Sequence, residues 1–331
     1  MADIYFQVVK NFGMELKNYK KMWNIYLCNT DQGLKILQPV RGQEGRIWFQ
    51  HSTKEHLYRQ GFKQISRFYL SAQETPYYTY NRQRYVLEDW EDGEELDYTD
   101  FESIQQVTEL LGSFHQASKG MCPFKEADIV SYYSMFPNQM EKRTMELHRF
   151  RKRVYEHRRL SDFDLLLIRY YSYYYGLALE SLTLLEQGPC QVVMNTLKKA
   201  HYVCHGDFTH HNVRKTEKGW RISDFSLCSY HIPIYEFTRF VNKTMRKSQW
   251  SVERALKMFE IYKQYIYESK GMEQLFLSLL MFPEEFWKLC NLYYNQRRTY
   301  PSKKYLEKMQ ELIETQEEHQ QFLKEMKKHL L

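Results

Sequence analysis

Hydrophobic and polar positions alternate in short runs over the first hundred residues of the chain, which is the spacing of β-strands. Such runs lie at residues 24–29, 33–40, 64–71 and 84–90. The first two flank the turn residues Thr30 to Gly33, and this arrangement predicts a β-hairpin. A helix is predicted over residues 53–60, because Ser52 can cap its start and Gly61 can end it.

Beyond Asp100 the apolar residues recur mostly at helical spacing. The predicted helices are residues 101–118, 126–159, 161–187, 252–270, 272–296 and 302–329. Residues 202–225 interrupt them and read as short strands, a loop and a hairpin. We therefore expect an α+β fold with two lobes, a small β-rich N-terminal lobe over residues 1–90 and a larger, mainly helical C-terminal lobe over residues 91–331.

Composition places the chain among soluble globular proteins, with 43% hydrophobic and 27% charged residues in 331. No apolar run approaches the roughly 18 residues of a membrane span, and the N-terminus lacks a secretory signal, so we expect synthesis in the cytoplasm. The six cysteines form no C-x-x-C pair and are expected to be reduced thiols. A net charge of +6 permits an anionic substrate, and we do not expect nucleic acid as a partner.

A set of polar residues with a fixed spacing lies in the stretch that interrupts the helices. The run HGD ends at Asp207, and four residues separate it from Asn212. The predicted hairpin over residues 213–222 then leads to Asp224. Kinases use this order, in which the first Asp orients the nucleophile while the Asn and the second Asp hold metal against the phosphates. Oxygen ligands of this kind suit Mg²⁺. The spacing therefore predicts a catalytic loop for phosphoryl transfer.

The same loop is rich in histidine, which raises zinc binding as an alternative. His201, His205, His210 and His211 all lie within eleven residues. No Cys or carboxylate stands at a zinc-like spacing from them in the sequence, so we do not expect a zinc site. His205 is instead expected to brace the loop by hydrogen bonding, and His210 and His211 are expected to line the site or face solvent.

On these motifs the chain resembles the aminoglycoside phosphotransferase and choline kinase-like superfamily, and within it the CotS-type spore coat proteins of endospore-forming bacteria. The segments that carry the resemblance are GLKIL, HLYRQGFKQISRF, YVLEDWEDGEELDY, LLGSFHQAS, HGDFTHHNV and ISDF. The resemblance implies a protein-kinase-like fold, with ATP and Mg²⁺ as cofactors. It makes Asp207 the catalytic base, with His205 beside it in the catalytic loop, and Asn212 and Asp224 the metal ligands.

The resemblance also implies a nucleotide site in the N-terminal lobe. Lys35 becomes the lysine that pairs the nucleotide phosphates, and Glu55 its partner on the short helix. The hinge whose backbone would meet adenine consists of Leu87, Glu88, Asp89 and Trp90. The sequence also departs from the family pattern at three points. There is no G-x-G-x-x-G, Ser226 replaces the Gly of D-F-G, and Glu236 stands where related kinases usually carry Asp.

The expected function is an ATP- and magnesium-dependent phosphotransferase with an alcohol group as acceptor, on a small hydroxyl compound, a sugar or a spore coat component. The alternative, which the departures favour, is a catalytically weak or inactive kinase-fold protein that serves as a structural part of the spore coat. Spore coat proteins are expected partners, and the coat is the expected location. A basic stretch (Glu141–Arg159) reads as a solvated helix face, with docking of a polyanion or a negatively charged coat partner as the alternative.

Overall fold

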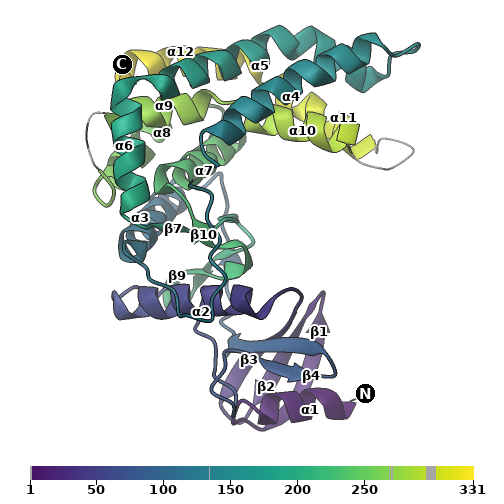
Figure 1. The fold of residues 1–331 in the computed structure, drawn as a ribbon, viewed down its shortest axis with the longest axis vertical. Helices are drawn as coiled ribbons and strands as arrows, with labels where there is room; N and C mark the ends of the chain where they lie inside the picture. The colour runs from purple at the N-terminus through teal and green to yellow at the C-terminus, as the bar shows by residue number, and fades with distance from the viewer. Residues whose placement is uncertain (1, 134, 268, 270, 296–302) are drawn as a thin grey trace. The chain divides into compact units, whose positions relative to one another are not determined.

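Figure 1 shows the computed structural model of the chain, which describes residues 2–133, 135–267, 269, 271–295 and 303–331. Their contacts define two compact units. The first consists of Met1–Ser131 and Ala200–His231, and the second of Tyr132–Lys199 and Ile232–Leu331. The lobe boundary expected at residue 90 differs from this division and stays a prediction. The predicted catalytic loop belongs to the first unit, together with the β-rich N-terminal part.

The first unit combines helices with three small sheets. Its helices are α1 (Ala2–Lys10), α2 (Glu44–Arg59), α3 (Phe101–Ser118) and the single 3-10 turn η1 (Phe225–Leu227). Its strands are β1 (Leu16–Met22), β2 (Ile25–Thr30), β3 (Gly33–Val40), β4 (Tyr78–Tyr80), β5 (Gln83–Asp89), β6 (Glu94–Glu95), β7 (Val203–Cys204), β8 (Val213–Thr216), β9 (Gly219–Ile222) and β10 (Ser229–Tyr230). A five-stranded antiparallel sheet has the order β1-β2-β3-β5-β4, a three-stranded sheet has the order β6-β8-β9, and β7 pairs with β10.

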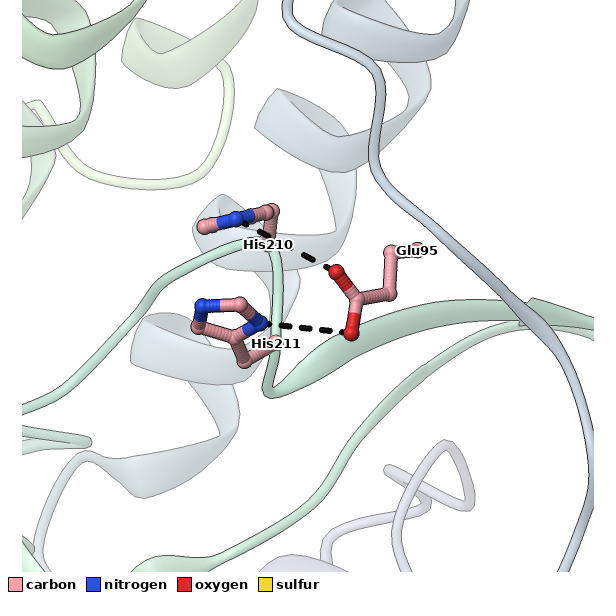
Figure 2. Close-up of side chains that lie close together, drawn as sticks. All are labelled: Glu95, His210 and His211. Atoms are coloured by element: carbon pink, nitrogen blue, oxygen red, sulfur yellow. Dashed lines mark hydrogen bonds and ion pairs between the residues drawn. The ribbon is translucent and has the colours of Figure 1, made fainter.

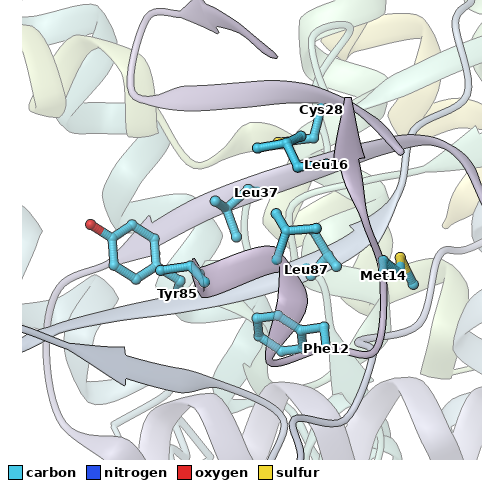
Figure 3. Close-up of a cluster of buried hydrophobic side chains, with 9 residues drawn as sticks. Phe12, Met14, Leu16, Cys28, Leu37, Tyr85 and Leu87 are labelled. Carbon is cyan, nitrogen blue, oxygen red and sulfur yellow. The ribbon is translucent and has the colours of Figure 1, made fainter. Parts of the chain in front are cut away.

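The two faces of the five-stranded sheet carry different apolar clusters, because successive side chains of a strand point to opposite faces. On one face Leu37, Tyr85 and Leu87 pack with Val8 and Val9 of α1. Figure 3 shows the same three side chains with Phe12 and Met14 of the segment after α1. On the other face Val86 packs with Ile47 of α2. Leu37 and Leu87 lie directly opposite each other on β3 and β5. Helix α1 therefore covers one face of the sheet and α2 the other.

Several predicted elements of the first unit are confirmed and others are corrected. The β2–β3 hairpin has the predicted register, with Thr30 opposite Gly33, and α3 spans the predicted residues. Residues 64–71 form no strand of the sheets but only single bridges. The helix predicted from residue 53 starts at Glu44, so Ser52 does not cap it. The Ser52 hydroxyl instead donates to Trp48 O at 2.7 Å inside the helix.

Every regular element that the structure describes in the second unit is a helix. Its helices are α4 (Asn138–Tyr155), α5 (Asp162–Glu186), α6 (Gly188–Lys199), α7 (Pro233–Lys247), α8 (Val252–Lys263), α9 (Gly271–Met281), α10 (Glu284–Asn295), α11 (Lys303–Glu314) and α12 (Gln316–Leu330). Helix α9 is buried along nearly its whole length and contacts α5, α6, α7 and α12. Gly271 begins it, and a Cβ there would lie 2.4 Å from Pro189 O, so only glycine permits this approach. Among the described residues, no helix is both long and apolar enough to traverse a lipid bilayer.

The helix boundaries of the second unit differ from the predicted ones where proline or a cap interrupts the pattern. The stretch predicted as one helix from residue 272 is two helices, with Pro283 at the break, and its predicted last residue, Gln296, lies outside the described residues. The helix predicted over residues 302–329 is divided at Thr315 into α11 and α12, and its predicted first residue, Ser302, also lies outside the described residues. Helices α6 and α7 were not predicted. Each carries a proline in its first turn, Pro189 and Pro233, where proline is tolerated.

The basic stretch lies largely on α4, and part of it packs inside the second unit. The guanidinium of Arg143 lies 4.3 Å from the Trp287 ring centroid, and its Nη1 is 3.3 Å from Glu284 Oε1. Arg153 Nη1 donates to Tyr294 O at 2.9 Å. These two arginines therefore stabilise helix packing, and only the remaining cations of the stretch are available to a polyanion.

A buried histidine lies in the second unit at α12. His319 Nδ1 is 3.0 Å from Tyr173 Oη, and its ring centroid is 4.3 Å from that of Trp250. Burial lowers the pKa of His319 to about 4, and the positive charge of Arg246 adds to this. The folded protein therefore keeps this imidazole neutral at pH values where an unfolded chain would protonate it.

This shift predicts a loss of stability in mild acid. Unfolded His319 binds a proton near pH 6.5, whereas folded His319 does so only near pH 4, so its contribution is complete above pH 6.5 and is lost as the pH falls between these values. The expected loss in unfolding free energy at pH 4 is about 3 kcal/mol. Urea unfolding between pH 7 and pH 4 should show a flatter pH dependence in His319→Gln than in wild type. His329→Gln, an exposed change on the same helix, should keep the wild-type slope, and equal slopes in all three proteins would contradict the assignment.

Candidate active site

The predicted catalytic loop connects two short β-elements of the first unit. It follows β7, which pairs with β10, and it leads into β8. Strands β8 and β9 form the hairpin predicted over residues 213–222, with Val213 opposite Ile222. The hydroxyl of Thr216 donates to Gly219 O at 3.0 Å and closes the turn. The loop is thus anchored at both ends by paired backbone.

Asn212 holds Asp207 in place. Its Nδ2 donates to Asp207 Oδ2 and to Asp207 O, both at 3.0 Å. The main-chain O of Asn212 accepts a hydrogen bond from Ser223 N at 2.9 Å. Because Ser223 directly precedes Asp224, this bond ties the end of the hairpin to the loop. Three residues that the sequence singled out, Asp207, Asn212 and Asp224, therefore belong to one connected piece of structure.

His205 joins the same two segments from the inside. It is fully buried, and its Nε2 donates to Ser223 O at 2.8 Å. Its Nδ1 accepts from Asp207 N at 3.3 Å. A neutral ring that carries its proton on Nε2 satisfies both bonds. The ring centroid lies 4.9 Å from that of Phe225, which packs against it edge-on. His205 thus fixes the backbone on either side of the site.

Two backbone conformations at the site restrict which residues fit. Gly206 has φ +85°, and a Cβ there would lie 2.3 Å from Leu227 O. Asp224 has φ +54°, in the left-handed region that Asp tolerates better than most residues. Its Oδ1 accepts from Ser226 N at 3.1 Å, which caps η1. The buried ring of Phe225 anchors this turn, so the Asp224 carboxylate is presented to solvent from a fixed backbone.

A buried ion pair lies near Phe225, the residue that follows Asp224. Lys54 of α2 forms an ion pair with Glu88 of β5, and both residues are buried. The Lys54 ammonium lies 4.3 Å from the Phe68 ring centroid and 5.4 Å from that of Phe225. Burial raises the pKa of Glu88, Lys54 opposes this rise, and the negative charge of Asp224 adds to it. Because Phe225 directly follows Asp224, the contact of Lys54 with the Phe225 ring places this pair next to the end of the β8–β9 hairpin.

The ion pair expected between Lys35 and Glu55 is wrong. Lys35 Nζ lies 2.8 Å from Asp89 Oδ1, whereas Glu55 accepts two hydrogen bonds from Arg67, each of 2.6 Å. The reason is the strand periodicity. Lys35 lies on the same face of β3 as Leu37, which packs toward α1, whereas Glu55 belongs to α2 on the opposite face.

The predicted hinge is well bonded within the protein. Leu87 O accepts from Tyr69 N at 2.8 Å, and Asp89 O accepts from Ser66 Oγ at 3.2 Å. Trp90 N donates to a main-chain oxygen of β3 at 3.1 Å. The side chains of this segment also have partners, since Asp89 accepts from Tyr69 Oη at 2.9 Å. An adenine ring would have to compete with these hydrogen bonds.

The donor atoms of the loop and hairpin fit a hard divalent cation. Asn212 uses its amide nitrogen on Asp207, which leaves its side-chain oxygen for a cation. Asp224 is exposed and Asp207 is half-buried, so both carboxylates are accessible to solvent. Carboxylate and amide oxygens are the ligands that Mg²⁺ prefers. The residues present therefore suit the ion that the motif implies.

The sequence did not single out Lys54. It lies in a run of consecutive buried polar residues on α2: Gln50, His51, Ser52, Thr53, Lys54 and Glu55. Such a run ordinarily indicates an exposed segment, because polar side chains lose hydration when they are buried. The sequence did offer one indication of a buried lysine. Glu88 and Asp89 end the apolar run YVLED, and a carboxylate buried at the end of such a run needs a cation nearby.

Comparison with known proteins identifies sequence relatives of the chain. A model of the family described as spore coat putative kinase YutH matches residues 6–326. Spore coat protein S of Bacillus subtilis (strain 168) is 24% identical over 318 residues, which cover 93% of this chain and 87% of that protein. The resemblance to spore coat proteins that the sequence motifs indicated is thereby confirmed.

Two solved phosphotransferase structures have the same fold as this chain. An aminoglycoside phosphotransferase from Alicyclobacillus acidocaldarius superposes with a TM-score of 0.86 at 18% identity, covering 98% of this chain and 95% of that one. Spectinomycin phosphotransferase, solved in complex with ADP and spectinomycin, superposes with a TM-score of 0.57 at 14% identity, covering 95% and 94%. The predicted α+β, protein-kinase-like fold is confirmed. At these identities the likeness establishes the fold and not the activity.

Proposed function

The chain belongs to the spore coat putative kinase YutH family, and on this basis we propose that it is an ATP- and magnesium-dependent phosphotransferase. Its acceptor would be the hydroxyl group of a small compound, a sugar or a coat component. The observation that supports this most directly is the hydrogen-bond network of the candidate active site. In it Asn212 bonds to Asp207 and, through Ser223, to the segment that presents Asp224.

Each residue of the network has a distinct part in the proposed reaction. Asp207 Oδ atoms would orient the acceptor hydroxyl and take its proton. Asn212 fixes the rotamer of that carboxylate through its amide nitrogen. Asn212 and Asp224 would hold a magnesium ion, which when bound offsets the negative charge of the phosphates. His205 holds the two backbone segments in register, so it is a positioning residue.

The cation that steadies the phosphates is proposed to be Lys54. Lys35, which the family resemblance favours, has its ammonium group bound to Asp89 and lies on the sheet face toward α1. Lys54 lies near Phe225 and is paired with Glu88, a carboxyl group whose pKa is raised in part by the negative charge of Asp224. A phosphate could share the Lys54 ammonium with Glu88, because an ammonium group donates up to three hydrogen bonds.

The proposed association with the spore coat rests on a sequence relative of the chain. Because spore coat protein S is a relative over most of this chain, we propose that the protein is associated with the spore coat and that other coat proteins are its partners. The ADP in the spectinomycin phosphotransferase structure supports an adenine nucleotide as the donor for this chain.

Nucleotide binding tests the proposed function. Saturating Mg-ATP should raise the melting temperature of the full-length protein, since a ligand at 100 times its Kd contributes about 2.7 kcal/mol to folded stability. Asp224→Asn should abolish most of this shift, because Asn keeps the left-handed backbone but removes the charge. Glu217→Gln changes an exposed carboxylate in the same hairpin and should behave as wild type. A wild-type protein with no magnesium-dependent shift would exclude the proposal.

A structural role in the coat is the second candidate function. It is favoured by the hydrogen bonds that already occupy the predicted hinge backbone and by the engagement of Lys35 with Asp89. If the fold serves only as a scaffold, spores that carry Asp207→Asn should assemble a normal coat. A coat defect in spores whose variant protein accumulates to the wild-type level would instead require the carboxylate, and with it the phosphotransferase.

A further inference from the structure

Three potential metal ligands converge at the end of the predicted catalytic loop. Figure 2 shows the carboxylate of Glu95 next to the rings of His210 and His211. His211 Nδ1 lies 3.2 Å from Glu95 Oε1, and His210 Nε2 lies 4.0 Å from Glu95 Oε2. One ligand atom from each of the three residues lies within 4.8 Å of the others. The sequence could not indicate this set, because Glu95 is far from the two histidines along the chain.

Backbone pairing explains why Glu95 lies there. Strand β6 pairs antiparallel with β8, so that Glu95 stands opposite Arg214, directly after the catalytic loop. The two histidine rings lie 3.8 Å apart between centroids, and the ring of His210 also packs on Tyr98 at 5.7 Å. The loop end and the short strand therefore hold the three side chains together before any ion binds.

The spacing and exposure suit an ion from solvent. Ligand atoms about 2.0–2.1 Å from a tetrahedral zinc ion are about 3.3 Å apart from one another. The His211–Glu95 distance already matches this value, and the His210–Glu95 distance requires only a small side-chain rotation. The side chains are accessible, with exposed fractions of 67% for His211, 41% for Glu95 and 32% for His210.

We propose that Glu95, His210 and His211 form a binding site for one divalent transition-metal ion, with zinc as the ion that fits best. Two imidazoles and a carboxylate are a common zinc ligand set with a fourth position open for water. Imidazole nitrogen selects transition metals over Mg²⁺, so this site differs in chemistry from the oxygen donors of Asp207, Asn212 and Asp224. It does not depend on the phosphotransferase activity.

An ion at this site would stiffen the catalytic loop. His210 and His211 are the last two of the four residues between Asp207 and Asn212. Anchoring both rings to Glu95 of β6 through a metal would restrict the motion of that segment. Arg214 opposes ion binding, because its Nη2 lies 3.4 Å from Glu95 Oε1 and its charge repels a cation.

Calorimetric titration of zinc into the tag-free, full-length protein tests the site, with excess Mg²⁺ present to saturate the oxygen donors. We expect one zinc ion per chain, with at least a tenfold weaker Kd in His211→Ala and in Glu95→Gln. Arg214→Gln should bind zinc more tightly than wild type. The matched control His201→Ala removes an exposed histidine of the same unit and should leave the Kd unchanged.

Asp224→Asn separates this site from the proposed magnesium site. It should bind zinc as wild type does, whatever its effect on Mg-ATP binding. Cobalt substitution gives an independent readout, since tetrahedral cobalt with nitrogen ligands absorbs visible light strongly and the band should vanish in His211→Ala. The proposal is overturned if the wild-type protein binds no zinc, or if both His211→Ala and Glu95→Gln keep the wild-type Kd for zinc. It is also overturned if Asp224→Asn is the only variant that loses zinc binding.

Discussion

The Asp207→Asn variant should lose about a hundred- to ten-thousand-fold in phosphotransfer rate while keeping its fold. The carboxylate is the proposed acceptor of the hydroxyl proton, and an amide cannot take that role. An amide can still accept the hydrogen bond that Asn212 Nδ2 donates to Asp207 Oδ2, so the loop should retain its geometry. The rate is measured as ADP release from Mg-ATP with water as the acceptor.

The control for this variant is Glu217→Gln, which makes the same chemical change at an exposed turn residue of the hairpin. Its turnover should equal that of wild type. Binding of Mg-ATP should persist in Asp207→Asn, because the proposed metal ligands Asn212 and Asp224 remain. Undiminished ADP release in Asp207→Asn would remove Asp207 from the reaction, even if nucleotide binding were intact.

The Lys54→Met variant should lose about 3–5 kcal/mol in unfolding free energy, because it leaves the buried Glu88 carboxylate without its cation. The double variant Lys54→Met/Glu88→Leu should recover much of this loss, since it removes both charges together. Lys218→Met is the matched control. Lys218 forms an exposed ion pair with Glu91 at 3.1 Å, and such pairs contribute less than about 1 kcal/mol. Chemical unfolding monitored by circular dichroism gives the free energies.

The pH dependence of Lys54→Met provides a second check. Burial raises the pKa of Glu88 and Lys54 opposes that rise, so the pKa of Glu88 should be higher still in the variant. When folding raises the pKa of a carboxyl group, the unfolding free energy of the protein falls as the pH rises above the ordinary carboxyl pKa of about 4.3. The stability difference from wild type should therefore shrink between pH 7 and pH 5. A constant difference over this range would show that Glu88 is not the group left unpaired.

The parts of the fold that the sequence predicted are those where local signals and tertiary packing agree. The β2–β3 hairpin has a turn at Thr30 to Gly33, and α3 begins after Asp100, whose side chain accepts from Glu102 N at 3.1 Å. Strand β1 was missed because lysines fill its exposed positions and obscure the alternation. Pairing with β2 forms this strand, and sequence periodicity does not report on partners.

In the candidate site, too, the sequence predicted what depends on local spacing and missed what depends on tertiary structure. The loop and hairpin around Asp207 and Asn212 could be predicted, because their spacing is local and the hairpin between them and Asp224 is short. The partners of Lys35 and Glu55 could not, since they depend on which face of a sheet each side chain occupies. The approach of Glu95 to the loop depends likewise on the register of β6 with β8.

The discontinuity of the first unit has a consequence for its synthesis on the ribosome. Phe114 of α3 packs against Phe225, and Met121 O accepts from Tyr230 Oη at 2.8 Å, but these partners emerge only after about a hundred further residues. At 5–20 residues per second, that interval lasts about 5–20 s. During this time the apolar side of α3 has no native partner from residues 200–231. A nascent chain that stops before Ala200 would leave this apolar surface exposed and prone to aggregation, so the segment that holds the predicted catalytic loop also completes the first unit.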